Sequence, residues 1–376
     1  MLEHVYSLLS IIYTRERQTC QVFLISISMK WHENINRVEF EISSYCNARC
    51  PQCPREVLRN NENWAPKSLD LAFFQNRLGK EFFQKIKNVM FCGTYGDPSM
   101  AKDALEICQF IRLANPNIHI DFHTNGGTRN EDWWSELAKI IGVNGKVVWG
   151  FDGLEDTNHL YRIGVDWSRA WKNAKSFIDV GGIAEWQFII FKHNEHQVEK
   201  ARLLSLDNGF SSFVERPSSR FIYDLYTTGE LRTYIDNEQR YIDPPIDKKF
   251  RHPFLDSAIV SKIKKQDLSE VFNLVDHITM IDCESKKHKK MYITVDGLLM
   301  PCEHLVPNVY YDIDLFPSGE NFPEFDKKYP LSLIDLNQVT VDEAISSKWF
   351  EGLTESWNKK TCTGRINTCA RVCGKV

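Results

Sequence analysis

Residues 37–55 read RVEFEISSYCNARCPQCPR and decide the fold. Residues 37–43 form a short run rich in β-branched and aromatic side chains, which is typical of a strand. Cys46, Cys50 and Cys53 follow directly, three cysteines within eight positions. Three thiolates at this spacing can reach three corners of an iron–sulfur cube from one loop. The stretch therefore predicts a strand followed by a [4Fe–4S] loop with one iron lacking a protein ligand. The alternatives are zinc, which normally needs four ligands, or buried free thiols.

Outward from this loop, strand and helix patterns alternate along the chain. Helices are expected where apolar residues recur three and four positions apart, at 70–86, 101–114, 131–141, 168–180 and 195–208. Strands are expected at 37–43, 88–92, 117–122, 146–151, 185–191 and 211–214. This alternation favours a parallel sheet with right-handed crossovers. We therefore expect an α/β fold, with six strands in a partial (β/α)6 TIM-type barrel or an open sheet.

Composition excludes several classes of protein. The 376 residues carry 46 Lys and Arg against 50 Asp and Glu, a net charge of −4, which does not suggest binding to nucleic acid or to anionic lipid. No apolar run reaches the roughly 20 residues that span a bilayer. The first 13 residues have Glu3 and His4 where a signal peptide has basic residues. We expect a cytoplasmic protein without membrane contact, in which residues 1–28, before Met29, are an appendage or an over-long start.

The chain is long enough for more than one domain. We expect a small C-terminal cysteine-rich α+β domain after the barrel, with a strand at 291–295, a turn at Asp296-Gly297 and a helical stretch at 341–357. The predicted divisions are an N-terminal extension at 1–36, the barrel core at 37–216, a bridging region at 217–275 and the cysteine-rich domain at 276–376.

The chain has eleven cysteines, and their clustering favours metal ligation over disulfides. Cys20, Cys92 and Cys108 fall in apolar runs and are expected to be buried small hydrophobic residues.

The C-x3-C-x2-C loop directly after a first strand resembles the signature of the radical S-adenosylmethionine (radical SAM) superfamily. The resemblance implies that Cys46, Cys50 and Cys53 hold the catalytic cluster and that S-adenosylmethionine chelates the unique iron. Reduction then cleaves S-adenosylmethionine to a 5′-deoxyadenosyl radical, which abstracts hydrogen from a substrate. The family usually has an aromatic residue just before the third cysteine, and this chain has Gln52 there.

Later loops extend the resemblance, because a barrel of this kind carries its site at the carboxyl ends of its strands. The loop Gly93-Thr94-Tyr95-Gly96-Asp97-Pro98 is similar to the family's glycine–glycine–acid loop, although on its own Gly-Asp-Pro is simply a turn. The resemblance implies that Asp97 accepts the methionine ammonium and that Arg162 pairs with the methionine carboxylate; a solvated loop arginine is the alternative for Arg162. The cofactor-binding candidates are Gly93, Gly96, Asp97, Asn125, Asp152 and Arg162.

The string Cys283-x13-Gly297-x4-Cys302 predicts a strand–turn–strand unit with one cysteine on each arm. It resembles the opening of the auxiliary-cluster domains called SPASM and twitch. Five cysteines suffice for one auxiliary [4Fe–4S] cluster but not for two, and a zinc ribbon is the alternative. We expect Cys283, Cys302 and Cys373 as ligands, with Cys369 preferred over Cys362 as the fourth.

By this resemblance the chain is an oxidoreductase, or an enzyme that modifies a peptide or a small molecule by another radical reaction. It would need an electron donor such as flavodoxin or ferredoxin. The alternative is a non-catalytic protein that binds an iron–sulfur cluster or zinc.

Overall fold

The computed structural model describes residues 31, 35–59, 64–235, 240–256, 280–310, 322–359 and 364–375. Predictions about residues 1–28, Cys20 and Cys362 lie outside these described residues. Among the described residues, no helix combines the length and apolar character needed to cross a bilayer.

An eight-stranded sheet forms the centre of the fold, with the order β11-β10-β1-β2-β3-β4-β5-β6. The strands from β10 to β6 run parallel, and β11 pairs antiparallel with β10. The bounds are β1 Arg37–Phe40, β2 Asn88–Phe91, β3 His119–Thr124, β4 Gly145–Gly150, β5 Ala184–Ile190, β6 Ser212–Pro217, β10 Lys290–Ile293 and β11 Leu299–Met300. Two small antiparallel pairs join β7 Thr233–Ile235 to β8 Arg240–Ile242, and β9 Met280–Ile281 to β12 Gly374–Lys375.

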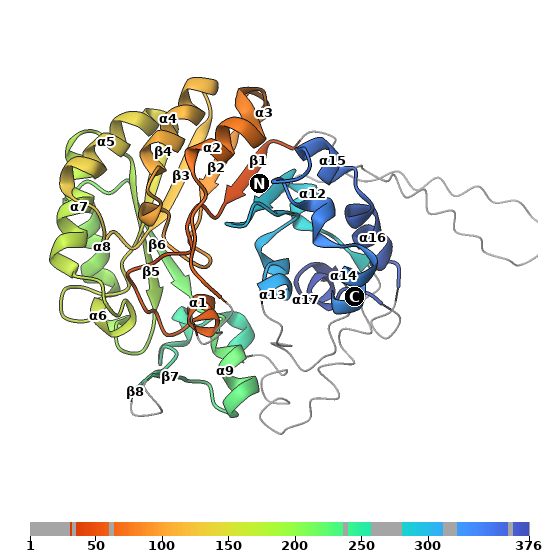
Figure 1. Cartoon of the computed structure of the whole chain (residues 1–376). Coiled ribbons are helices and arrows are strands. Elements are labelled where there is room, and N and C mark those ends of the chain that lie inside the picture. The colour runs from red at the N-terminus through yellow and green to blue at the C-terminus, as the bar shows by residue number, and fades with distance from the viewer. Residues whose placement is uncertain are drawn as a thin grey trace, which may run out of the picture. The chain divides into compact units, whose positions relative to one another are not determined.

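Helices fill the connections between the parallel strands (Figure 1). In the first part of the chain these are α1 Pro54–Leu58, α2 Leu71–Phe73, α3 Gly79–Lys85, α4 Ala104–Ala114, α5 Glu131–Ile141, α6 Asn158–Tyr161, α7 Trp167–Asp179, α8 Val198–Asp207 and α9 Phe221–Thr228. The C-terminal region adds α12 Glu284–Lys287, α13 Pro307–Tyr310, α14 Phe322–Lys328, α15 Val341–Ile345, α16 Lys348–Ser356 and α17 Asn367–Cys373.

The two faces of β1 show how the sequence positions the sheet. The side chains of Val38 and Phe40 are fully buried, and the Phe40 ring centroid lies 5.1 Å from that of Phe74 on the helix-covered face. The intervening Glu39 and Glu41 must point to the opposite face, because successive strand residues alternate. Both carboxyl groups are nevertheless buried. The inner face of β1 is therefore polar, and the cysteine loop follows shortly after this strand.

The prediction of an α/β fold with a parallel sheet is confirmed, and every strand expected in the barrel region is present. Their ends differ from the predicted ones by no more than three residues. In the described part of the chain the sheet does not close, because β6 and β11 are its edges. The architecture is a partial barrel.

Two helix predictions missed interruptions. The stretch expected at 70–86 contains a π-helical segment, Phe74–Leu78, and changes direction at Gly79, whose φ of +71° suits glycine. The stretch expected at 341–357 breaks at Ser346 and Ser347 into α15 and α16. Ser347 is extended, with ψ of 161°, as expected for a serine that starts a new helix.

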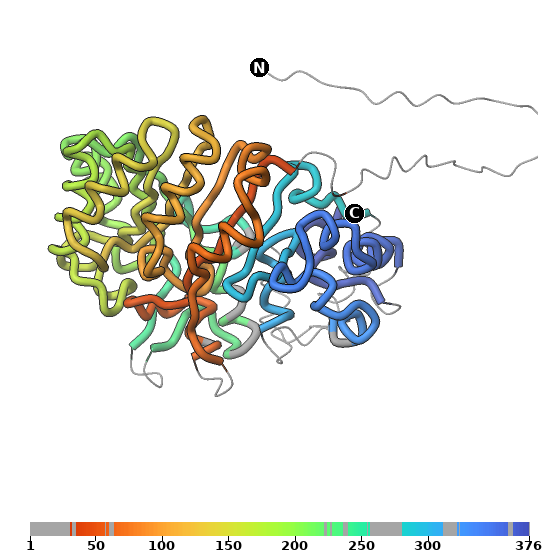
Figure 2. Tube along the Cα trace, turned by 45° about the horizontal axis from the view of Figure 1, so that its top comes forward, coloured from red at the N-terminus to blue at the C-terminus, as the bar shows by residue number. Residues whose placement is uncertain are grey.

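The C-terminal region shares the central sheet. Residues Arg37–Phe40 pair in parallel register with Lys290–Ile293, and Figures 1 and 2 show the C-terminal segment beside β1. This pairing joins segments about 250 residues apart, so local periodicity could not reveal it. The divisions at 1–36, 37–216, 217–275 and 276–376 stay predictions.

Candidate active site at the strand ends

The cysteine loop follows β1 and is fixed by backbone contacts to its neighbours. The backbone N–H of Asp97 donates to the carbonyl of Tyr45 at 2.8 Å, and the N–H of Arg49 donates to the carbonyl of Ile163 at 2.8 Å. A turn within the loop is closed by the N–H of Cys53, which donates to the carbonyl of Cys50 at 2.9 Å. These bonds tie the loop to the segments that follow β2 and β4.

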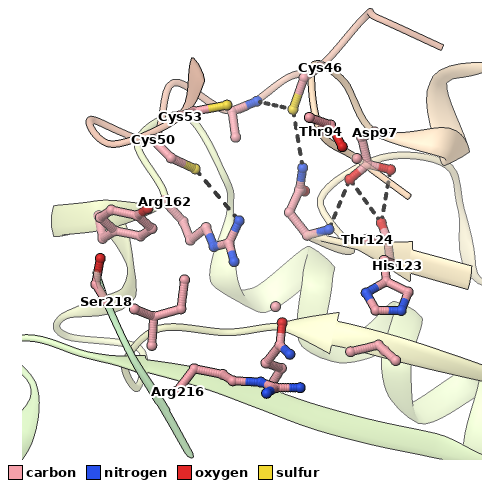
Figure 3. A pocket seen from close by; sticks show the side chains of 18 of the residues that line it. Cys46, Cys50, Cys53, Thr94, Asp97, His123, Thr124, Arg162, Arg216 and Ser218 are labelled. Carbon is pink, nitrogen blue, oxygen red and sulfur yellow. Dashed lines mark hydrogen bonds between the residues drawn. The ribbon is translucent and has the colours of Figure 1, made fainter. Parts of the chain in front are cut away.

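Cys46, Cys50 and Cys53 line one cavity of about 350 Å³ (Figure 3). Most of the rest of its wall comes from strands β2 to β6 and from the segments that follow them. The lining residues include Gly93, Thr94, Gly96, Asp97, His123, Thr124, Asn125, Gly150, Arg162, Gln187, Arg216 and Ser218. Residues spread over some 170 positions of sequence therefore meet at one edge of the sheet.

Burial raises the pKa of all three thiols, and for Cys50 it does so to about 11. The neighbouring cations Arg162 and Arg220 oppose this rise for Cys50 and Cys53, respectively. The thiols would therefore be neutral at pH 7 on their own, and ligation of a metal would ionise them.

Two hydrogen bonds from side chains reach the cysteine sulfurs. The amide of Asn125 donates to Sγ of Cys46 at 3.6 Å, and the guanidinium of Arg162 donates to Sγ of Cys50 at 3.6 Å. The backbone N–H of Ala48 adds a third contact to Cys46 at 3.4 Å. Donors to sulfur are a known means of tuning iron–sulfur clusters.

The two glycines of the loop after β2 allow close backbone approach. A Cβ on Gly96 would lie 2.0 Å from the carbonyl oxygen of Ser43, and one on Gly93 would lie 2.3 Å from that of Gly96. No side chain fits at either position without moving the backbone of the loop. Gly96 therefore allows this loop to pack against the segment after β1, and Gly93 allows the loop to fold back on itself.

Asp97 is buried, and both of its carboxylate oxygens receive protein donors. The hydroxyl of Thr124 lies 3.0 Å from each oxygen, and the N–H of Asn125 donates at 2.9 Å. The N–H and the hydroxyl of Ser99 donate to Oδ1 at 3.0 and 2.5 Å. In this structure Asp97 positions the Thr124–Asn125 segment; its predicted contact with the ammonium of a ligand stays a prediction.

Asp152 and Arg162 form a buried ion pair, in which Nε of Arg162 lies 2.6 Å from Oδ2 of Asp152. Burial raises the pKa of the Asp152 carboxyl, and the attraction of Arg162 opposes that rise. The other oxygen of Asp152 accepts from the N–H of Ile189 at 2.6 Å. Gly150 makes room for the guanidinium, since a Cβ there would lie 2.4 Å from Nη2 of Arg162. Arg162 is therefore a fixed cation at the cavity wall and not a solvated loop side chain.

Sequence reasoning missed the inward residues of later strands. His123, Gln187 and Arg216 line the cavity from β3, β5 and β6 (Figure 3 labels His123 and Arg216). Burial lowers the pKa of His123, which favours its neutral form. The missed signal was a polar residue within each of these three strands.

Gln52, which stands where the family usually has an aromatic residue, does not line the cavity. Its amide donates to the hydroxyl of Thr233 at 2.8 Å and accepts from that of Ser218 at 2.7 Å. The side chain thus connects the cysteine loop to the segment after β6 and to β7.

A second cavity, of about 120 Å³, lies in the C-terminal region and is lined by Cys283, Cys302, Cys369 and Cys373. Three separate segments supply these cysteines. The pairing of β9 with β12 brings Cys283 and Cys373 together, and the N–H of Asp282 donates to the carbonyl of Cys373 at 2.9 Å. All four ligands expected for the auxiliary cluster therefore meet in one place.

The remaining described cysteines lie outside both cavities. Cys108 is fully buried in α4, as expected of a small hydrophobic residue. Cys92 keeps some exposed surface, but its thiol is buried, and this burial raises the pKa of the thiol.

The thiol donors of both cavities fit iron–sulfur clusters. Within the described residues, no three His, Cys, Asp or Glu side chains lie close enough to hold one metal ion. A tetrahedral zinc, about 2.3 Å from each thiolate, would need the sulfurs within roughly 4 Å of one another. An iron–sulfur cube binds each cysteine through a different iron, so its ligands stand farther apart.

Comparison with solved structures finds similar folds at low identity. Streptococcus suis SuiB bound to S-adenosylmethionine gives a TM-score of 0.49 and 16% identity, over 80% of this chain and 66% of that one. The protein anSMEcpe with bound AdoMet gives 0.49 and 16%, over 86% and 80%. BtrN in complex with AdoMet and 2-DOIA gives 0.43 and 13%, over 91% and 94%. The chain thus spans just under two thirds of the length of SuiB.

No curated protein shows a significant match to this sequence. The family model described as "Radical SAM superfamily" matches residues 40–204, which include the cysteine loop and strands β2 to β5. Residues 40–204 of this chain therefore match the radical SAM superfamily, as the cysteine loop predicted.

Proposed function

We propose that the enzyme binds a [4Fe–4S] cluster through Cys46, Cys50 and Cys53 and cleaves S-adenosylmethionine reductively. The observation that carries the proposal is the meeting of three thiols from one loop in a single cavity with the polar ends of five further strands. When bound, the cluster supplies the electron that yields a 5′-deoxyadenosyl radical, which abstracts hydrogen from a peptide or small-molecule substrate.

The chain's own residues would bind and orient S-adenosylmethionine. The Nε of Arg162 faces Asp152, so the outer nitrogens of its guanidinium remain for a carboxylate and for Cys50. The side-chain amide of Asn125 donates to Cys46, so Asn125 can fix the position of this cysteine relative to a bound ligand. Asp97 fixes Asn125 through the backbone, and Gly96 lets the loop lie close to the segment after β1.

We also propose one auxiliary [4Fe–4S] cluster, held by Cys283, Cys302, Cys369 and Cys373 in a SPASM- or twitch-like region. Its support is the convergence of these four cysteines, each of them partly buried, on one cavity. An auxiliary centre suits an oxidoreductase, because it can take the electron that remains after hydrogen abstraction.

The partners we propose are a peptide or small-molecule substrate and an electron donor such as flavodoxin or ferredoxin. The cytoplasmic location stays a prediction from the sequence. The cavity wall offers Arg216, His123 and Gln187 to a polar substrate group.

Anaerobic reconstitution tests the proposal directly. The purified protein is loaded with iron and sulfide, then given S-adenosylmethionine and dithionite, and 5′-deoxyadenosine is measured by mass spectrometry. We expect S-adenosylmethionine-dependent formation of 5′-deoxyadenosine and of methionine. Fully loaded protein that forms neither product would support a non-catalytic iron–sulfur protein, and zinc in place of iron and sulfide would support a zinc site.

A further inference from the structure

Lys290 lies between the inner face of the central sheet and the C-terminal cysteine cavity. It is the first residue of β10, and it lines the cavity together with Cys302. Its Nζ lies 3.2 Å from Oε2 of Glu39 on β1 and 3.1 Å from Oε2 of Glu303. The lysine therefore connects a carboxylate of the barrel with a carboxylate of the cysteine cavity.

This charge cluster is shielded from water. The side chain of Lys290 is 18% exposed, that of Glu39 is 5% exposed, and that of Glu303 is 31% exposed. The two carboxylates raise the pKa of Lys290 against the effect of its burial, so the ammonium stays charged. Charges in such a setting act on their neighbours more strongly than exposed charges, because water screens them less.

Cys302 experiences both signs of charge. Glu303 follows Cys302 directly in the sequence, and Lys290 lines the same cavity as Cys302. Lys290 and Glu303 would act in opposite directions on any metal centre that Cys302 ligates. A nearby cation stabilises an added electron, and a nearby anion destabilises it.

We propose that Lys290 sets the reduction potential of the auxiliary centre, with Glu303 as its opposing charge. Lys290 is thus a positioning and tuning residue and touches no reacting atom. The inference rests on the proposed auxiliary cluster, and it adds to it the residue that decides how readily that cluster accepts an electron.

The chain offers a matched control three residues earlier, at the end of α12. Lys287 has the same side chain and also forms an ion pair, with Glu284 at 3.4 Å, but it is 54% exposed and does not line the cavity. Removing its charge changes the net charge by the same amount as removing that of Lys290. Only the place of the charge differs.

The test is a potentiometric titration of the reconstituted full-length protein, followed by electron paramagnetic resonance. Addition of S-adenosylmethionine identifies the signal of the first cluster, because only that centre binds it. For Lys290→Met we expect the auxiliary centre to become harder to reduce, with a tenfold lower ratio of reduced to oxidised centre at fixed potential, or about 59 mV for one electron. Glu303→Gln should shift the ratio in the opposite direction, and Lys290→Arg and Lys287→Met should leave it near the native value.

Opposite shifts of the potential in Lys290→Met and Glu303→Gln distinguish an electrostatic effect from damage to the fold. Damage to the site would not change the direction of the shift according to the sign of the charge removed. Iron is counted in every variant before the titration. Equal midpoints for native protein, Lys290→Met and Glu303→Gln, with about eight irons each, would overturn this inference and leave the auxiliary cluster standing. Native protein with only about four irons would overturn both the auxiliary cluster and the inference.

Discussion

The two cysteine cavities are built in different ways. At the strand ends, Cys46, Cys50 and Cys53 come from one loop, and the polar wall opposite them comes from the parallel strands. In the C-terminal region, Cys283, Cys302, Cys369 and Cys373 come from three segments that meet through a short two-stranded pairing. The first cavity depends on local sequence placed on a rigid sheet, whereas the second depends on long-range assembly. A local ligand set should therefore tolerate changes elsewhere better than an assembled one.

The largest effect is expected when one cysteine of the first loop is removed. Cys50→Ala leaves two thiols, so we expect the loss of about four irons and of all detectable 5′-deoxyadenosine formation. Iron, sulfide and product are measured after anaerobic reconstitution. Cys108→Ala, in α4 and outside both cavities, is the matched control. Retention of all iron by Cys50→Ala would show that the loop does not ligate a cluster.

The corresponding change in the second cavity is Cys302→Ala. We expect this variant to lose about four irons as well, but to keep the signal of the first cluster and its response to S-adenosylmethionine. The reason is that the two cavities share no cysteine. An iron content equal to that of the native protein would refute the auxiliary site and leave the first one untouched.

A smaller effect is expected from Arg162→Met, which removes the fixed cation of the first cavity. A charge-assisted hydrogen bond contributes about 1.5–3 kcal/mol, so the affinity for S-adenosylmethionine should fall roughly 10- to 100-fold. Equilibrium dialysis of the reconstituted, unreduced protein measures this affinity. Arg169→Met, on the exposed face of α7, should bind as the native protein does. Equal affinities of the two variants for S-adenosylmethionine would show that Arg162 does not contribute to binding it.

The last prediction concerns the stability of the fold and not the chemistry of a site, and it involves Glu41, a buried residue next to β1. It accepts from the N–H of Tyr95 at 2.6 Å, and burial raises its pKa from 4.5 to about 8. Between these values the folded protein holds a proton that the unfolded chain releases, so the free energy of unfolding falls as the pH rises from about 4.5 to 8. Glu41→Gln removes this loss of unfolding free energy, which is on the order of 4 kcal/mol at pH 8.

Thermal melting at pH 5 and pH 8, at one scan rate, checks this prediction. The variant should melt at a higher temperature than the native protein at pH 8 and nearly equally at pH 5. Glu136→Gln, on the surface of α5 with a side chain 52% exposed, should show no such difference. A gain of equal size at both pH values would mean that ionisation of Glu41 is not its source.

The parts of the fold that were predictable from sequence are the parts with local signals. The strand pattern before Cys46 and the helices that Asn130 and Asp166 cap follow from neighbouring residues; each of these caps accepts the N–H of the residue three positions on. The break at Ser346 was equally local, but apolar periodicity outweighed it in the prediction.

Other features depend on contacts that no local pattern contains. The ion pair of Arg162 with Asp152 needs the space left by Gly150, and the bonds of Gln52 need Thr233, 181 residues away. From the sequence, Gln52 was visible only as a departure from the family's motif, and the residues that it contacts could not be predicted. Such residues become interpretable once the sheet has set their neighbours.

The parallel pairing of β1 with β10 has a consequence for biosynthesis. Residue 40 leaves the ribosome some 250 residues before its partner Ile293 does. At roughly 5–20 residues per second, one edge of β1 stays without its final neighbour for roughly 10–50 s. Throughout that interval β1 can pair with β2 on its other side, but the edge that β10 covers in the folded protein is open to other proteins, such as chaperones.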